Sequence, residues 1–172
     1  MKDNTMAEKP DTLKLTRTFD APRDVVFDAW TDPKLIERWW GPKGFTVPVC
    51  KMDLRIGGVY LNCMRSPESK DYWSTGVYRE IVRPERLVCT DSFADETGKV
   101  VPASYYGMSP DFPLELVIKI TFSSDEEGKT KLTLEHVGMP ASEHEMCSSG
   151  WNESFDKLEN VTRELAASRK VA

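Results

Sequence analysis

The segment RTFDAPRDVVFDAWTDPKLIERWWGP, residues 17–42, constrains the fold most, because a strand and two short helices follow one another in it. Residues 13–19 alternate apolar and polar side chains, which is typical of a half-buried strand. Pro22 suits the first position of a helix, and Asp32 is a good N-cap for a second helix that ends at Gly41-Pro42. Two short helices without a linker cannot bury their apolar faces alone, so the segment predicts a sheet against which they lie.

The middle of the chain is typical of strands joined by short turns. Hairpins are predicted in residues 45–64 and 72–93, and further strands in residues 116–122 and 132–136. Most of these connections are too short for crossover helices, so we expect an antiparallel sheet. The exception is the loop of residues 94–112, because a loop of this length in a compact domain is often functional. A surface loop pinned by its own aromatic residues and a lid over a cavity are equally good interpretations of it.

Apolar spacing near the C-terminus predicts a long helix from about Ser142 to Ala167. One face of this helix carries Cys147, Trp151, Phe155, Leu158, Thr162 and Leu165, at intervals of three and four residues. These residues are expected to pack on the sheet. The predicted elements together indicate an α+β fold with six or seven antiparallel strands, two short helices after the first strand and a long final helix.

Length and composition favour a single domain. The chain has 172 residues, of which 40% are hydrophobic and 30% charged, so we expect one domain over residues 12–170 after a flexible tail of residues 1–11. The sequence contains no apolar run that could cross a membrane and no signal-peptide pattern, so we expect a cytoplasmic protein. Its four scattered cysteines are typical of reduced, buried thiols.

Charge and motifs exclude several classes of function. A net charge of −5 without a basic cluster argues against binding to nucleic acid or to anionic membranes, and the lack of a long apolar run argues against insertion into a membrane. His144-Glu145 lacks the second histidine of a zinc-protease helix, and Gly128-Lys129-Thr130 lacks the first glycine of a phosphate-binding loop. With two histidines and no paired cysteines, the chain is expected to hold neither a metal nor another cofactor.

Five segments resemble a known family. They are APRDVVFDAW, Trp39-Trp40, the run DLRIGG at residues 53–58, the run GVYREI at residues 76–81, and Gly150-Trp151. In this order they resemble the bacterial and archaeal proteins related to the C-terminal domain of the activator of Hsp90 ATPase, and the resemblance extends from about Leu13 to Leu165. That family lies in the START-like, or SRPBCC, helix-grip superfamily, whose fold resembles Bet v 1. The resemblance implies a curved antiparallel sheet wrapped on the C-terminal helix, with a cavity between them.

The candidate site residues are those whose neighbours point toward this implied cavity. Its wall is expected to include Trp39, Tyr60, Met64, Trp73, Tyr78, Asp91, Phe93, His136, Trp151 and Phe155. Tyr105, Tyr106, Met108 and Phe112 form the possible lid. Asp91 shares one face of its predicted strand with Leu87, Cys89 and Phe93, and His136 shares one with Leu132 and Leu134. Both could therefore orient a ligand or carry acid–base chemistry. Alternatively, each lies at a strand end in water or in a satisfied hydrogen bond, and a register slip of one residue would turn Tyr60, Trp73 and Tyr78 outward.

Three hypotheses for function follow from different classes. The first is non-enzymatic binding of a hydrophobic or aromatic small molecule, such as a lipid or a polyketide-like compound, in the internal cavity. The second is a protein-interaction role on an Hsp90-type chaperone, as the resemblance implies. The third is a small cofactor-free cyclase or hydrolase that uses Asp91 and His136, although no catalytic motif supports it. We favour the first hypothesis and expect that the protein is not an enzyme.

Overall fold

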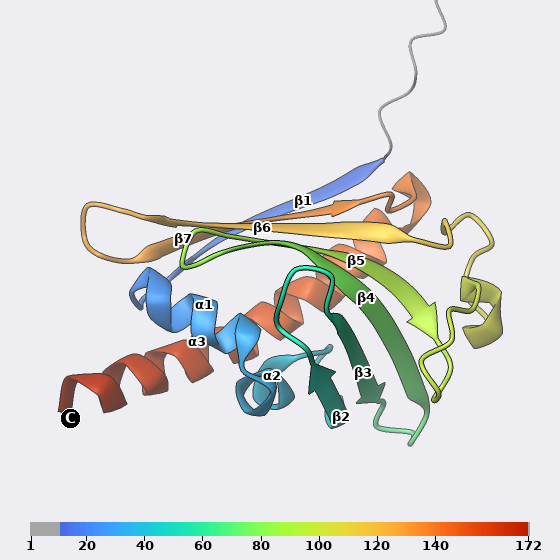
Figure 1. Ribbon diagram of the computed structural model, residues 1–172, viewed down its shortest axis with the longest axis horizontal. Helices are drawn as coiled ribbons and strands as arrows, with labels where there is room; N and C mark the ends of the chain where they lie inside the picture. The colour runs from blue at the N-terminus through green and yellow to red at the C-terminus, as the bar shows by residue number, and fades with distance from the viewer. Residues whose placement is uncertain (1–10, 172) are drawn as a thin grey trace, which may run out of the picture.

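The computed structural model describes residues 11–171, in which one seven-stranded antiparallel sheet covers three helices (Figure 1). The strands are β1 (Thr12–Phe19), β2 (Thr46–Met52), β3 (Val59–Arg65), β4 (Asp71–Val82), β5 (Arg86–Ala94), β6 (Leu116–Ser124) and β7 (Thr130–Val137). Their order in the sheet is β1-β7-β6-β5-β4-β3-β2, and every neighbouring pair is antiparallel. The predicted fold class, with its antiparallel sheet and long final helix, is therefore confirmed.

All three helices lie on the same side of the sheet, which bends over them (Figure 1). They are α1 (Arg23–Thr31), α2 (Pro33–Trp39) and α3 (His144–Val171), and a short 3₁₀ turn, η2 (Ala141–Glu143), leads into α3. The side chain of Asp32 caps α2 as predicted, since it accepts a hydrogen bond from the backbone N–H of Lys34 at 3.0 Å. The two short helices predicted after the first strand therefore form, and they lie against the sheet as expected.

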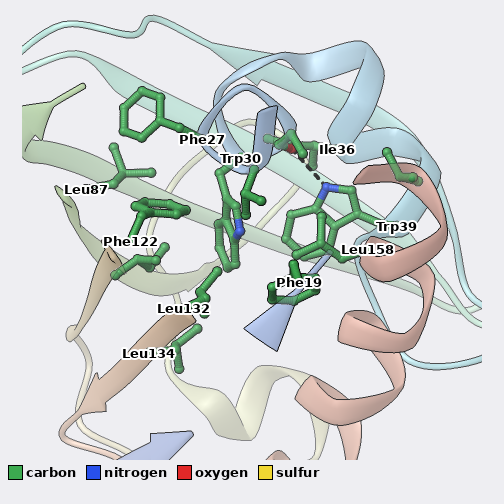
Figure 2. Packing of buried hydrophobic residues seen from close by; sticks show 14 of the residues in the cluster. Phe19, Phe27, Trp30, Ile36, Trp39, Leu87, Phe122, Leu132, Leu134 and Leu158 are labelled. Carbon is green, nitrogen blue, oxygen red and sulfur yellow. Dashed lines mark hydrogen bonds between the residues drawn. The ribbon is translucent and has the colours of Figure 1, made fainter. Parts of the chain in front are cut away.

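The main core fills the space between the helices and the sheet (Figure 2). Phe19, Trp39, Phe155 and Leu158 are fully buried there, and the rings of Phe19 and Phe155 meet edge to face with centroids 6.0 Å apart. The indole Nε1 of Trp39 donates a hydrogen bond to the backbone oxygen of Ala29 at 2.9 Å, which ties α2 to α1. The buried polar atom of this large side chain therefore has its partner, as a closed core requires.

A smaller apolar cluster lies under the long loop at the other end of the sheet. It contains Leu13, Ala103, Phe112, Leu116 and Met139, with Trp151 packed against it. The loop itself forms a short 3₁₀ helix, η1 (Ala103–Tyr106). The core thus has two parts, and the second is built largely around the loop.

The N-terminal residues 1–10 of the predicted tail lie outside the described residues. Asp11, which we assigned to the tail, accepts backbone hydrogen bonds from Gly138 through its carbonyl and from Ala141 through its carboxylate. Of the helices within residues 11–171, none has the length and apolar character needed to cross a membrane. All four cysteines are free thiols.

Candidate functional site

A cavity of about 530 Å³ lies between the first half of α3 and strands β3, β4 and β5. The segment after α2 and the loop between β5 and β6 complete its wall. The lining residues are Trp40, Gly41, Pro42, Phe45, Met64, Tyr72, Trp73, Ser74, Asp91, Ser92, Phe93, Tyr106, Gly107, Met108, Phe112, Leu116, His136, Met139, Met146, Cys147, Gly150, Trp151 and Ser154. Aromatic rings and methionines make up much of this lining, so the cavity offers a predominantly apolar contact surface.

The structure brings six of the predicted wall residues to this cavity. They are Met64, Trp73, Asp91, Phe93, His136 and Trp151. Four others, Trp39, Tyr60, Tyr78 and Phe155, are buried in the main core and are not among the lining residues. Trp39 is the last residue of α2 and keeps to its buried face, whereas the backbone of Trp40 is already extended and its ring reaches the cavity. Phe155 lies one helical turn after Trp151, where the side chain on this face of α3 is fully buried in the main core.

Three of the four possible lid residues line the cavity. Tyr106, Met108 and Phe112 do so, whereas Tyr105 points outward with 60% of its surface exposed. The hydroxyl of Tyr106 accepts a hydrogen bond from the backbone N–H of Trp73 at 3.0 Å and donates one to the backbone oxygen of Ala94. The loop is therefore pinned by its own aromatic residue and also forms part of the cavity wall.

A chain of hydrogen bonds connects polar side chains along this wall. The indole Nε1 of Trp151 lies 3.2 Å from Nδ1 of His136, and Nε2 of His136 lies 2.9 Å from Oδ2 of Asp91. An indole N–H can only donate, so Nδ1 of His136 must be the acceptor and Nε2 must carry the imidazole proton. His136 is thus a neutral imidazole that donates to the Asp91 carboxylate, and it has no ring nitrogen left for a ligand.

The hydroxyl of Tyr60, on β3, contacts the other carboxylate oxygen of Asp91. The Tyr60 hydroxyl lies 3.2 Å from Oδ1 of Asp91 and 2.9 Å from the backbone oxygen of Thr90, so one hydroxyl proton serves two acceptors. Burial, followed by the nearby Asp91 charge, raises the pKa of Tyr60 well above the ordinary tyrosine value. Tyr60 therefore remains a hydrogen-bond donor at neutral pH.

Gly76 makes this approach possible. Tyr60 on β3 pairs with Gly76 on β4, and a Cβ atom at Gly76 would lie 2.5 Å from Cε1 of Tyr60 and 1.9 Å from the backbone oxygen of Thr90. Because glycine has no Cβ, the tyrosine ring can cross β4 and reach β5. The backbone N–H of Val77 donates to the Thr90 hydroxyl at 2.8 Å. The Tyr60 hydroxyl thus reaches the strand that carries Asp91.

The remaining reactive group in the cavity wall is Cys147. Burial, with smaller effects from the charges of Glu143 and Asp91, raises the pKa of its thiol to about 11. At neutral pH the group is therefore a thiol and a poor nucleophile. Within residues 11–171, no three His, Cys, Asp or Glu side chains are grouped so that they could hold a metal ion. The acceptor capacity of Asp91 is the strongest polar feature that the wall presents.

The sequence interpretation missed several lining residues. They include Trp40, Phe45, Tyr72, Met139, Met146, Cys147 and Gly150. Two signals were available, since Cys147 lies on the predicted apolar face of the final helix and Trp40 is adjacent to Trp39. Phe45 and Tyr72 begin the two predicted hairpins, and only the folded arrangement brings their ring centroids to 6.3 Å from each other.

Comparison with known proteins identifies the relatives of this fold. Residues 20–163 match the sequence model of a family described as Activator of Hsp90 ATPase homolog 1-like protein. No curated protein matches the chain.

Several solved structures superimpose on most of the chain. A crystal structure of a protein from Chromobacterium violaceum has 27% identity and a TM-score of 0.73, covering 88% of this chain and 96% of the other. A Silicibacter pomeroyi protein that carries the same family name has 23% identity and a TM-score of 0.70, covering 92% and 99% respectively. A Nitrosomonas europaea protein has 22% identity and a TM-score of 0.73, covering 91% and 96%. The last two likenesses concern the fold alone.

Proposed function

Because the chain belongs to the family of Activator of Hsp90 ATPase homolog 1-like proteins, which fixes its fold but not its ligand, we propose that it binds an apolar or aromatic small molecule without chemical conversion. The ligand would lie between α3 and strands β3 to β5. Met64, Trp73, Phe93 and Trp151 would form the wall, together with the Asp91–His136 pair. Tyr106, Met108 and Phe112 would cover it from the loop.

The cavity is the observation that carries this proposal. Its volume of about 530 Å³ lies within the range of about 300–1,000 Å³ that is usual for small-molecule sites. Such sites combine an apolar lining with a few placed polar groups, and here aromatic rings surround a single hydrogen-bonded carboxylate. This combination supports binding of one compact apolar molecule in a defined orientation.

The enzyme alternative is less well supported by the same geometry. Both ring nitrogens of His136 are engaged, by Trp151 and by Asp91, so the imidazole offers no lone pair to a substrate. The thiol of Cys147 has a raised pKa, which removes the other candidate nucleophile of the wall. Of the two residues that the enzyme hypothesis uses, only Asp91 is left to exchange a proton with a substrate.

The chaperone alternative is weakened by the orientation of the loop. We considered the aromatic residues of the loop as a docking patch for an Hsp90-type partner. Tyr106 and Phe112 are buried, however, and leave Val100, Tyr105 and Leu114 as the large apolar residues exposed between β5 and β6. The loop is better suited to enclose a small molecule than to form the centre of a protein interface.

We also place the proposed binding activity in the cytoplasm. A reducing compartment would keep Cys50, Cys63, Cys89 and Cys147 as the free thiols that they are in this fold. The single domain over residues 12–170 would then act on its own.

Native mass spectrometry of the protein purified from its own host tests the proposal, since a retained small molecule would add mass to the folded chain. The matched test is a pair of variants with an added aromatic ring. Gly150→Phe places the ring in the cavity wall, where a Cβ would make only an ordinary 3.6 Å contact with Pro42, and Val82→Phe places it at an exposed position on β4. We expect saturable binding of an aromatic probe by the wild type and by Val82→Phe, and loss of binding in Gly150→Phe. Equal binding by all three folded proteins would contradict the proposed site.

A further inference from the structure

We infer that the cavity selects an apolar molecule that carries one protonated amine, and that this amine binds to the carboxylate of Asp91. The inference rests on the proposed binding function and names the chemical class of its ligand. It depends on three features of the wall: the unused acceptor capacity of Asp91, the signs of the surrounding charges, and the aromatic rings beside the carboxylate.

Asp91 presents an acceptor that the protein satisfies only in part. Its two oxygens receive hydrogen bonds from the neutral groups of His136 and Tyr60, at 2.9 and 3.2 Å. A carboxylate can accept about four hydrogen bonds, so about two positions remain open. The side chain of Asp91 lies in the cavity wall, and 21% of its surface is accessible to solvent. A ligand can therefore reach it, and only a ligand that donates a hydrogen bond completes its coordination.

The charges around the cavity favour a cation in that position. Among the described residues that line the cavity, Asp91 is the only charged one when His136 is neutral, and none is Lys or Arg. Lys70 and Lys157 approach lining residues without lining the cavity themselves. Nζ of Lys70 lies 3.5 Å from the backbone oxygen of Tyr106, and Nζ of Lys157 lies 3.2 Å from that of Pro42. A negative charge in a cavity without a lining cation disfavours an anionic ligand and favours an ammonium group.

Aromatic rings near the Asp91 carboxylate also favour a ligand with a positive charge. Phe93 lies on the same face of β5 as Asp91, two residues away, and both residues line the cavity. The ring of Trp151 lies 5.9 Å from that of His136, which binds Asp91. The negative faces of such rings attract ammonium groups, and they also provide apolar contact for the rest of the ligand. Charge, hydrogen bonding and packing thus favour the same class of molecule.

The test compares three probes that share one aromatic ring system: naphthylmethylamine, naphthalenemethanol and naphthoate. At neutral pH they carry a positive charge, no charge and a negative charge. We expect calorimetric titration of the wild type to show that the amine binds about tenfold or more tightly than the carboxylate, with the alcohol between them. Asp91→Asn, which preserves the size of the side chain, should weaken amine binding by about tenfold. Glu96→Gln, an exposed site beyond the end of β5, removes one negative charge outside the cavity and should keep the wild-type order.

Each outcome separates this inference from the proposed function. Equal binding of the three probes, or tighter binding of the carboxylate, would overturn the amine preference and leave the binding function intact. Unchanged amine binding in a folded Asp91→Asn protein would overturn the role of Asp91. Failure of the wild type to bind any of the probes would contradict both proposals. If Asp91→Asn does not fold, as judged by thermal unfolding, the order of affinities in the wild type still decides the ligand class.

Discussion

The indole N–H of Trp151 on α3 donates a hydrogen bond across 3.2 Å to Nδ1 of His136 on β7. This bond joins the helix to the sheet at the cavity wall and determines which ring nitrogen of His136 carries the proton. Because Nε2 carries the proton, His136 donates to Oδ2 of Asp91, and the Tyr60 hydroxyl contacts Oδ1 of the same carboxylate.

The first prediction concerns the tautomer of His136. In the wild type at neutral pH the proton should reside on Nε2, because Nδ1 must accept from Trp151. Trp151→Phe keeps an aromatic ring but removes the donor, so the Nδ1 signal should shift, while the proton should stay on Nε2 rather than pass to Nδ1, because Nε2–H still donates to Asp91. Two-bond nitrogen–proton correlation spectra of the imidazole distinguish the two forms. A dominant Nδ1–H form in the wild type would show that this hydrogen-bond chain is wrong.

The second prediction concerns stability at alkaline pH. Burial is the main cause of the raised pKa of Tyr60, so the folded protein retains a proton that the unfolded chain releases at about pH 10. The unfolded state then binds fewer protons, and the free energy of unfolding falls as the pH rises through this value. Below about pH 9 Tyr60 is protonated in both states and causes no pH dependence.

Urea unfolding at a series of pH values measures this effect. Tyr60→Phe should be less stable at neutral pH by about 1–3 kcal/mol, because the buried oxygen of Thr90 loses its donor. Its stability should also fall less steeply above about pH 10. Burial likewise raises the pKa of Tyr78, so some alkaline loss should remain in the variant. Identical slopes in the two proteins would contradict the assignment to Tyr60.

The third prediction concerns Gly76→Ala. The added methyl group would lie 1.9 Å from the backbone oxygen of Thr90, so β4 or β5 would have to shift. We expect destabilisation of about 1–3 kcal/mol or more, together with displacement of the Tyr60 ring. Chemical denaturation measures the energy, and the Tyr60 hydroxyl contact can be followed by NMR. A variant as stable as the wild type would mean that Tyr60 does not cross β4 at this glycine.

The fourth prediction is that Gly150→Ala, unlike Gly76→Ala, makes the protein more stable. Gly150 lies within α3, and a Cβ there would be 3.6 Å from Pro42, an ordinary contact. Gly150→Ala should therefore stabilise the protein by up to about 1 kcal/mol through helix propensity. Thermal unfolding provides the comparison with Gly76→Ala, and destabilisation at Gly150 would mean that the cavity edge at Pro42 is tighter than the structure indicates.

Much of the fold was predictable from local patterns in the sequence. Alternation of apolar residues located the strands, and Asp32 located the start of α2, because both signals depend only on neighbouring residues. The long helix was predicted from Ser142 to Ala167 and extends from His144 to Val171. Its apolar face was predictable because the 3.6-residue period persists over many turns.

The site was less predictable, because alternation shows which face a residue occupies but not its distance from the end of the sheet. Tyr60 and Tyr78 point inward, yet they lie in the main core and not among the residues that line the cavity. Trp39 and Trp40 differ by one residue, and the end of α2 between them sends one ring to the core and the other to the cavity. The contact of His136 with Asp91 joins residues on β7 and β5, which no local pattern could pair.

The most direct test of the account is the response of the five tryptophan indole N–H signals to a neutral aromatic ligand. Trp40, Trp73 and Trp151 line the cavity, whereas Trp30 and Trp39 belong to the buried core. Titration with naphthalenemethanol, followed by nitrogen–proton NMR, should shift the three lining signals most, with saturation at one ligand per protein. Unchanged spectra at high ligand concentration, or shifts greatest at Trp30 and Trp39, would contradict the claim that this cavity is the binding site.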